Sequence, residues 1–251
     1  MAKFMTLMHE IGILNYQNTE VSGERNFCHQ YLASLDHPVV LDIGANVGGY
    51  SMTCLSGQGH ARIFAFEPHP ITFRTLEENT ARFGIACFNL GMSDQIGTLS
   101  LHDYAEEDGS SHASVYREVF SLIHKKPSVS HVVPMSTVDQ QVEILGLETI
   151  DLLKIDTEGH EMAVLKGAEK TIRANRVNAI QFEFNEHAIC ARTFFRDFWE
   201  FLPEYDFYRL LPGGALHFGF YFPLICETYA FQNIICLKKG IKMPVPVIEL
   251  G

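Results

Sequence analysis

Basic charge is scarce in this sequence of 251 residues, which has 19 Lys and Arg against 30 Asp and Glu and a formal net charge of −11. Binding to nucleic acid depends mainly on Lys and Arg that neutralise phosphates, so the composition argues against a general nucleic-acid binder. The sequence also contains no uninterrupted apolar run of the roughly 20 residues that a membrane span needs. Residues 1–15 lack the basic start, apolar stretch and cleavage site of a signal peptide.

Closely spaced cysteines are absent as well, because the six cysteines are scattered without a Cys-x-x-Cys pair. This spacing argues against a thiolate metal site or a disulfide framework and favours reduced, mostly buried thiols. Together with the missing signal peptide, it predicts a cytoplasmic protein. Hydrophobic residues make up 47% and charged residues 20% of the chain, so we expect a folded core with little disorder away from the ends.

The most informative stretch is an apolar run over residues 39–43, with Asp42 near its end, that leads into a turn rich in glycine. A run without polar alternation is typical of a strand buried on both faces of a parallel sheet. Gly44 and Gly48 allow positive φ, and a helix that opens near Gly48 presents unpaired N–H donors. Asn46 stands where the dinucleotide fingerprint has a central glycine that lets the backbone reach a pyrophosphate. The turn therefore favours a ligand other than a dinucleotide.

Two further strands are predicted before the middle of the chain. The strand over residues 62–66 ends in Glu67, which lies roughly 20 residues beyond the glycine turn, where a ribose-binding acid belongs in a mononucleotide-binding half-fold. A carboxylate there can accept hydrogen bonds from both ribose hydroxyls. The strand over residues 85–90 is followed by Ser93 and Asp94. These two polar residues could contact a ligand at the end of the strand, or they could simply form an Asx turn.

The predicted fourth strand covers residues 150–156, and a group of acidic residues lies at its end. Asp156, Glu158, His160 and Glu161 all lie around one strand-to-helix turn. Open parallel sheets bind ligands beyond the carboxyl ends of their strands, so this turn should face the glycine turn of the first strand. Such a cluster of titratable groups predicts a functional site.

Taken together, these segments resemble the FkbM family of S-adenosylmethionine (SAM)-dependent methyltransferases. The resemblance rests on residues 42–48 (DIGANVG), 66–68 (FEP), 90–94 (LGMSD), 136–139 (STVD) and above all 153–161 (LKIDTEGHE). It implies an α/β, Rossmann-like class I methyltransferase with a seven-stranded, mostly parallel sheet, an antiparallel last strand and helices on both faces. It also implies SAM as cofactor and methylation of a hydroxyl on a sugar, glycan or secondary metabolite.

The resemblance divides the chain into a helical extension over residues 1–38, a methyltransferase domain over 39–240 and a tail over 241–251. Within the domain, we expect residues 103–131 and 212–229 to form a lid or a wall of the acceptor pocket. Residues 212–229 could instead form a homodimer contact.

For the cofactor, we expect Glu67 to bind the ribose, Ser93 and Asp94 the adenine, and Gly44 and Asn46 the methionine end, with Asp42 and Asp156 in support. For the base that removes the acceptor proton, the hypothesis is His160, because histidine works near neutral pH with little tuning. Asp156 or Glu158 would orient it, and Asp156 is the second choice of base.

Several alternatives remain open at this point. Magnesium could assist, since Asp156 ends one strand while Glu183, Asn185 and Glu186 end the next and offer oxygen ligands. The acceptor could be a nitrogen of a small molecule. A SAM- or nucleotide-binding module without catalysis would have no need for the acidic turn, and an NAD-dependent oxidoreductase is disfavoured by Asn46.

Overall fold

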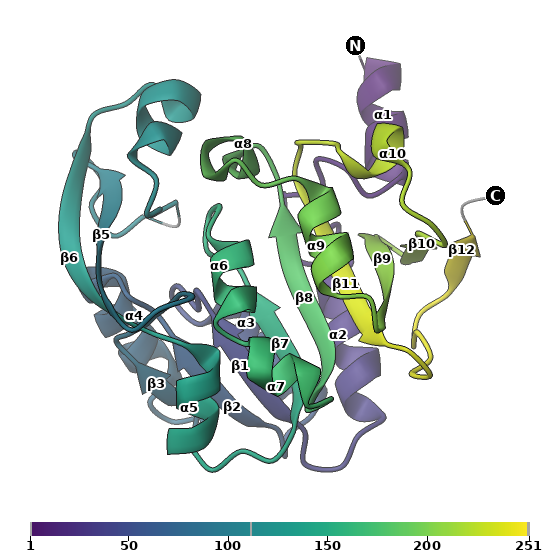
Figure 1. Ribbon diagram of the computed structural model, residues 1–251, viewed down its shortest axis with the longest axis horizontal. Helices are drawn as coiled ribbons and strands as arrows, with labels where there is room; N and C mark the ends of the chain where they lie inside the picture. Colours follow the sequence, from purple (N-terminus) through teal and green to yellow (C-terminus); the bar gives the residue numbers. More distant parts are fainter. Residues whose placement is uncertain (1, 111, 250–251) are drawn as a thin grey trace.

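A computed structural model describes residues 2–110 and 112–249 and contains a large central sheet (Figure 1). Its strand order is β12-β10-β9-β11-β8-β7-β1-β2-β3. The strands are β1 (Val39–Ile43), β2 (Arg62–Phe66), β3 (Ala86–Phe88), β7 (Ile150–Ile155), β8 (Val177–Phe184), β9 (Tyr205–Leu211), β10 (Gly214–His217), β11 (Gln232–Lys238) and β12 (Val247–Glu249).

The central sheet is parallel from β3 to β8, and β11 runs antiparallel to both β8 and β9. The chain moves outward from β1 to β3 and then returns to β7 on the other side of β1, so the strand order reverses between β1 and β7. This confirms the predicted mostly parallel sheet with an antiparallel last strand. β10 and β12 extend the sheet beyond β9, which the sequence interpretation did not include.

Helices cover both faces of the sheet and bury two hydrophobic clusters. The aromatic and thiol side chains of α2 and α3 pack on one face, while α5, α6, α7 and α9 pack on the other. The helices are α1 (Ala2–Glu10), α2 (Glu24–Ala33), α3 (Gly49–Gly57), α4 (Pro70–Thr80), α5 (Val138–Ile144), α6 (Glu161–Lys166), α7 (Glu169–Arg173), α8 (His187–Ala191), α9 (Phe195–Phe201) and α10 (Pro223–Cys226). No helix in the described part of the chain is both long and apolar enough to cross a membrane.

A second, three-stranded sheet stands beside the central one, at the left of Figure 1. It consists of β4 (Gly91–Met92), β5 (Gly97–Tyr104) and β6 (Ser128–Ser136), with β5 and β6 paired antiparallel from one end to the other. A loop and a π-helix, η1 (Val119–His124), connect β5 to β6. We refer to residues 97–136 as the arm.

Residues 212–229 begin at the far edge of the central sheet. β10 pairs with β9 at the far edge of the central sheet, so this segment extends the sheet on the side away from β1. None of its residues lines the cavity described below. Sheet pairing carries these residues away from the point where the strand order reverses, and their role in an acceptor pocket or a homodimer contact stays a prediction.

Candidate active site

A cavity opens at the carboxyl ends of β1 and β7 and encloses about 690 Å³ when its open mouth is included. The central sheet contributes its polar lining, from Gly44, Asn46, Glu67, Asp156, Glu158 and His160. The arm contributes a wall that is mostly apolar, from Leu101, Ser110, Ala113, Val115, Val133 and Met135. A largely apolar cavity with a few convergent polar groups is the usual form of a small-molecule site.

The glycine turn brings two strand ends into close contact. A Cβ on Gly44 would lie 1.8 Å from the carbonyl oxygen of Asp156, and its φ of +77° is in the left-handed region. The backbone N–H of Asp156 donates to the carbonyl of Ile43 at 3.0 Å. Asn46 also has positive φ, at 49°. Gly44 is therefore required by the contact between β1 and β7 that forms the floor of the cavity.

Glu67 is buried at the end of β2 and is held by backbone donors alone. Its Oε2 accepts the N–H of Asn46 at 2.9 Å, and its Oε1 accepts the N–H of His69 at 2.8 Å. Burial raises the pKa of Glu67 to about 7, although these two hydrogen bonds act in the opposite direction. A carboxylate offers about four acceptor positions, so both oxygens can accept further hydrogen bonds from a ligand in the cavity.

Asp42 lies beneath the cavity rather than in its lining. Its Oδ2 accepts the hydroxyl of Ser51 at 2.6 Å, and its Oδ1 lies 3.7 Å from the Lys154 ammonium. Lys154 also donates to Asp156 at 2.9 Å. Burial alone would lower the pKa of Lys154, but the Asp156, Asp42 and Glu24 carboxylates outweigh it and raise that pKa. Asp42 thus belongs to a group of ion pairs with Lys154 that lies beneath the floor of the cavity.

His160 lines the cavity but does not contact the residues expected to orient it. Its Nε2 lies 2.9 Å from the hydroxyl of Ser93, which also donates to Asp94 at 3.1 Å. Burial lowers the pKa of His160 to about 4. Asp156 instead pairs with Lys154, and Glu158 lies within ion-pair distance of two other histidines. Ser93 is buried and Asp94 exposed, and neither lines the cavity.

The turn after β7 is organised by Glu161. Its Oε1 accepts the backbone N–H groups of Thr157 and Gly159, at 2.9 and 3.1 Å, and the Thr157 hydroxyl at 3.1 Å. Glu158 between them adopts a positive φ of 52°, which a residue with a side chain rarely does. The turn therefore fixes the direction of the Glu158 carboxylate, which faces His112 and His187.

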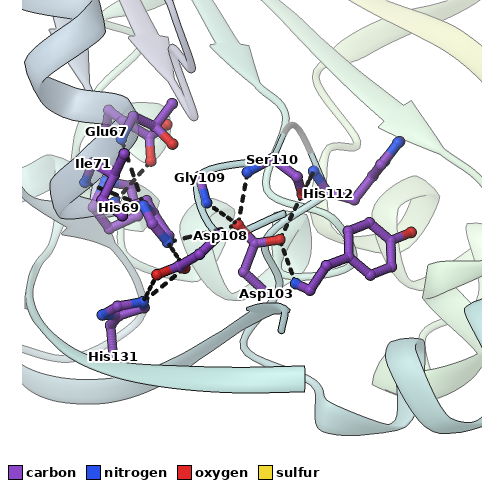
Figure 2. A network of polar contacts seen from close by, with 12 residues as sticks. Glu67, His69, Ile71, Asp103, Asp108, Gly109, Ser110, His112 and His131 are labelled. Carbon is purple, nitrogen blue, oxygen red and sulfur yellow. Dashed lines mark hydrogen bonds and ion pairs between the residues drawn. The ribbon is translucent and has the colours of Figure 1, made fainter. Parts of the chain in front are cut away.

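The arm is fastened to the central sheet close to Glu67 (Figure 2). The Nε2 atoms of His69 and His131 both approach Asp108, at 3.0 and 2.8 Å. In the described residues this trio is the group whose ligand atoms converge as in a metal site. However, Nδ1 of His69 accepts the N–H groups of Ile71 and Thr72, at 3.3 and 3.5 Å, which assigns the ring proton to Nε2. A proton on that nitrogen makes it a donor to Asp108 and occupies the position of a metal.

The oxygen set expected for magnesium does not converge either. Asp156 is paired with the Lys154 ammonium, and Glu183 accepts the side-chain amide of Asn185. Among the described residues, Glu183 and Glu186 belong to no group of three convergent ligands.

Known proteins share the segments that form this cavity. The model of the methyltransferase FkbM domain matches residues 42–208, more than half of the chain. The chain belongs to the FkbM methyltransferase family. The matched range contains every motif on which the resemblance rested, from the glycine turn to the turn after β7, so the predicted family is confirmed.

The FkbM-family relatives come from several kinds of organism. Methyltransferase sdnD of Sordaria araneosa is 30% identical over 57% of this chain and 65% of its own length. Hexuronic acid methyltransferase AglP of Haloferax volcanii is 28% identical over 62% of this chain and 60% of its own length. 2-O-methyltransferase NoeI of Sinorhizobium fredii is 26% identical over 74% of this chain and 81% of its own length. The chain thus spans less than two thirds of the length of sdnD and AglP.

Sequence reasoning expected residues 103–131 at the acceptor pocket but did not single out the side chains of the arm that line this FkbM-family site. Leu101, Val133 and Met135 of the apolar wall lie on β5 and β6, outside the range 103–131 that was expected at the pocket. His112 and His187 were not singled out, although they hold Glu158. The abundance of histidine in this chain, 12 residues in all, was the signal that could have directed attention to them.

Proposed function

We propose that this chain is a SAM-dependent methyltransferase that methylates a hydroxyl of a sugar, glycan or secondary metabolite. The observation that carries the proposal is Glu67, a buried carboxylate that lines the cavity beside the glycine turn at the point where the strand order reverses. Ligands of open α/β sheets bind at this point, and an acid after the second strand is placed to accept ribose hydroxyls.

The described residues fit such a cofactor along the length of the cavity. Glu67 would accept the ribose hydroxyls, since each of its oxygens carries one backbone hydrogen bond and keeps a further acceptor position. Pro68, Met92 and Met135 offer apolar surface to the adenine ring, with His160 and its partner Ser93 at the border of that surface.

The methionine end of the cofactor would lie over Gly44 and Asn46, toward Asp156. When bound, SAM supplies an electrophilic methyl group on a positively charged sulfur. The carboxylates of Asp156 and Glu158 line the cavity there and complement a positive charge. The acceptor would approach from the side of Glu158 and the arm.

The named relatives support a hydroxyl acceptor. They include a hexuronic acid methyltransferase, a 2-O-methyltransferase and a 31-O-demethyl-FK506 methyltransferase. These names cover a sugar acid and a secondary metabolite and specify oxygen in two of the three cases. Oxygen is therefore the favoured acceptor atom for this chain.

The direct test is the melting temperature of the purified protein with SAM, S-adenosylhomocysteine (SAH), NAD or ATP in large excess. A ligand at 100 times its dissociation constant adds about 2.7 kcal/mol, so binding is readily seen. We expect SAM and SAH alone to stabilise the protein, and Glu67→Ala to reduce both effects. Stabilisation by NAD, or by neither SAM nor SAH, would refute the proposed function.

If SAM binds, incubation with methyl-tritiated SAM and a set of glycosides, hexuronides and amines then identifies the acceptor class. We expect label to transfer to hydroxyl-bearing compounds. Label on amines alone would contradict the oxygen assignment and leave the cofactor assignment intact.

A further inference from the structure

Glu158 brings together two histidines from distant parts of the chain. Its Oε2 lies 2.6 Å from Nδ1 of His187, the first residue of α8, and its Oε1 lies 3.4 Å from Nδ1 of His112, in the arm. The side chain of Glu158 is 14% exposed and lines the cavity. Glu158 follows β7 and His187 follows β8, so the cluster lies beyond the carboxyl ends of these two strands.

The backbone around the cluster is arranged to hold this geometry. Glu158 has a positive φ, and a Cβ on the following Gly159 would lie 3.2 Å from the carbonyl of His187. The Ser114 hydroxyl donates to the carbonyl of Glu158 at 2.7 Å and ties the arm to this turn. Rare backbone conformations that are held in place by their surroundings are typical of functional sites.

The electrostatics keep Glu158 ionised. Burial acts to raise its pKa, but hydrogen bonds and charge from His112 and His187 outweigh burial and lower the pKa to about 2. A carboxylate that faces Nδ1 of an imidazole favours the proton on that nitrogen and leaves Nε2 free to accept another. Both histidines present Nδ1 to Glu158, and no described residue is hydrogen-bonded to Nε2 of His112.

The two histidines differ in access. The side chain of His187 is 5% exposed, whereas that of His112 is 48% exposed. Figure 2 shows His112 beside Ser110 in the arm, and both Ser110 and Ala113 line the cavity. A substrate that enters past the arm can therefore reach His112, while His187 is enclosed behind Glu158.

His160 is the weaker candidate for the same task. Its Nε2 is engaged by the Ser93 hydroxyl, and burial lowers its pKa to about 4, so it accepts a proton poorly at neutral pH. Its other nitrogen, Nδ1, is buried without a hydrogen-bond partner among the described residues. His160 therefore has no carboxylate in contact that would stabilise it when charged.

We infer that His112 is the general base of the reaction, with Glu158 holding its Nδ1–H and His187 acting as a positioning residue for Glu158. The inference rests on the proposed methyl transfer. An acceptor hydroxyl that forms its bond to the methyl carbon loses its proton to Nε2 of His112. The electron pair of the broken carbon–sulfur bond stays on the sulfur of the departing SAH.

The titration of His112 also depends on the other titratable groups that face it. Glu158 faces it from the end of β7. Tyr104 of β5 and His124 of η1 face it at ring-centre distances of 6.1 and 5.5 Å, and their side chains lie 2.7 Å apart. Asp103 and Asp156 act on it from farther away and, like Glu158, raise its pKa.

The test uses ¹⁵N NMR of the histidine rings in the complete chain, which shows which ring nitrogen carries the proton. The His112→Gln variant identifies the signals of His112. We expect neutral His112 to carry its proton on Nδ1, its titration midpoint to fall in Glu158→Gln, and its signals to shift when SAH is added. A proton on Nε2, or a midpoint unchanged in Glu158→Gln, would overturn the inference.

Because Glu158→Gln alters a strained turn, His187→Gln provides a second measurement that keeps the charge of Glu158. It should change the His112 titration without changing the tautomer. His217→Gln is the control, since Nδ1 of His217 also lies near a carboxylate, 2.8 Å from Glu249 at the far edge of the sheet, and its side chain is 23% exposed. We expect it to leave the His112 signals unchanged, and a shift as large as that of His187→Gln would overturn the positioning role.

Transfer of label from methyl-tritiated SAM to methyl β-D-glucuronoside provides the kinetic readout. His112→Gln should lower turnover by about 10²–10⁴-fold, the range of general-base catalysis, and retain the rise in melting temperature with SAH. Full turnover in His112→Gln would overturn the inference. The effect of SAH on the melting temperature of the wild type separates failure of the proposed function from failure of the base assignment. If SAH does not stabilise the protein, the proposed function fails. If SAH stabilises it but His112 carries its proton on Nε2, only the base assignment fails.

Discussion

The two sides of the cavity are held together by different kinds of interaction. On the sheet side, Glu67 is positioned by backbone N–H groups, and Gly44 by contact with the backbone of Asp156. On the side that faces the arm, the turn after β7 directs Glu158 toward two histidines, and Asp108 holds the arm between His69 and His131. Backbone N–H groups do not change their charge with pH, whereas contacts between histidines and carboxylates involve ionisable groups.

The difference is visible in the pKa values of two carboxylates that line the cavity, Glu67 and Glu158. Burial dominates at Glu67 and raises its pKa to about 7, whereas histidines dominate at Glu158 and lower its pKa to about 2. The first acid is suited to bind hydroxyl groups on a fixed frame. The second stays ionised and can stabilise a histidine that takes up a proton. In the proposed mechanism, the sheet side binds the cofactor and the arm side takes the proton of the acceptor.

The largest loss of stability is expected on the sheet side, when the cation that faces its buried carboxylates is removed. Lys154→Met removes the ammonium that faces Asp42 and Asp156 and leaves these carboxylates without a cation. Loss of one partner of a buried ion pair costs about 3–5 kcal/mol, which we expect in the free energy of unfolding measured with urea. Lys166→Met at an exposed position is the control, with an expected change below about 0.5 kcal/mol. A loss under 1 kcal/mol in Lys154→Met would show that the acids beneath the floor are neutral.

The backbone contact under the cavity gives the next largest effect. Gly44→Ala places a methyl group 1.8 Å from the carbonyl oxygen of Asp156 at a positive φ. Because backbone atoms on both sides must move, we expect a loss of about 2–3 kcal/mol in urea unfolding together with weaker SAH binding. Gly49→Ala is the matched control, since nothing lies within 4 Å of its added Cβ and α3 begins there. Equal stability of the two variants would contradict the proposed role of the Gly44 contact.

Glu67 makes the sheet side sensitive to pH in one direction. Its pKa of about 7 means that the free protein holds a neutral carboxyl below pH 7, while ribose hydroxyls favour the ionised acceptor. SAH affinity measured by calorimetry should therefore be constant above pH 7 and fall about tenfold per pH unit below it. Glu67→Gln should bind more weakly and show a flat profile in this range. A flat profile in the wild type would show that Glu67 does not bind the cofactor.

The sheet side is also the part that the sequence predicts well. The positions of Gly44, Glu67 and Asp156 follow from apolar runs that end in polar turns, because parallel strands bring such turns to one edge. Family membership and the reversal of strand order are confirmed for this part. The separation of Asp42 from the cavity was not predictable in the same way, since alternate residues of a strand point to opposite faces and the register decides which face meets Lys154.

The arm side was not predictable from local patterns. His112 and Glu158 are far apart in the chain, and their contact depends on how a long insertion folds back over the sheet. The expected pairing of His160 with Asp156 or Glu158 used nearness in sequence as a guide. In the structure the turn after β7 instead directs Glu158 toward the arm, and α6 carries His160 toward Ser93.

The smallest expected effect concerns the fastening of the arm. Asp108→Ala removes the acceptor shared by His69 and His131, and its side chain is 30% exposed, so the global free energy of unfolding should change by less than about 1 kcal/mol. The Asp103 carboxylate, 3.6 Å from Nε2 of His69, remains as an acceptor for the buried ring. We nevertheless expect faster hydrogen exchange across residues 103–131, because the loop loses its side-chain contact with the sheet.

Glu107→Ala, on the same exposed loop, is the matched control and should exchange like the wild type. If Asp108→Ala also exchanges like the wild type, the trio of His69, Asp108 and His131 does not fasten the arm. Faster exchange with an unchanged SAH affinity would instead separate the two sides of the cavity, because the cofactor would then depend on the sheet alone. Faster exchange with weaker SAH binding would show that the apolar wall of the arm contributes to the cofactor site, since Leu101, Val133 and Met135 are part of its lining.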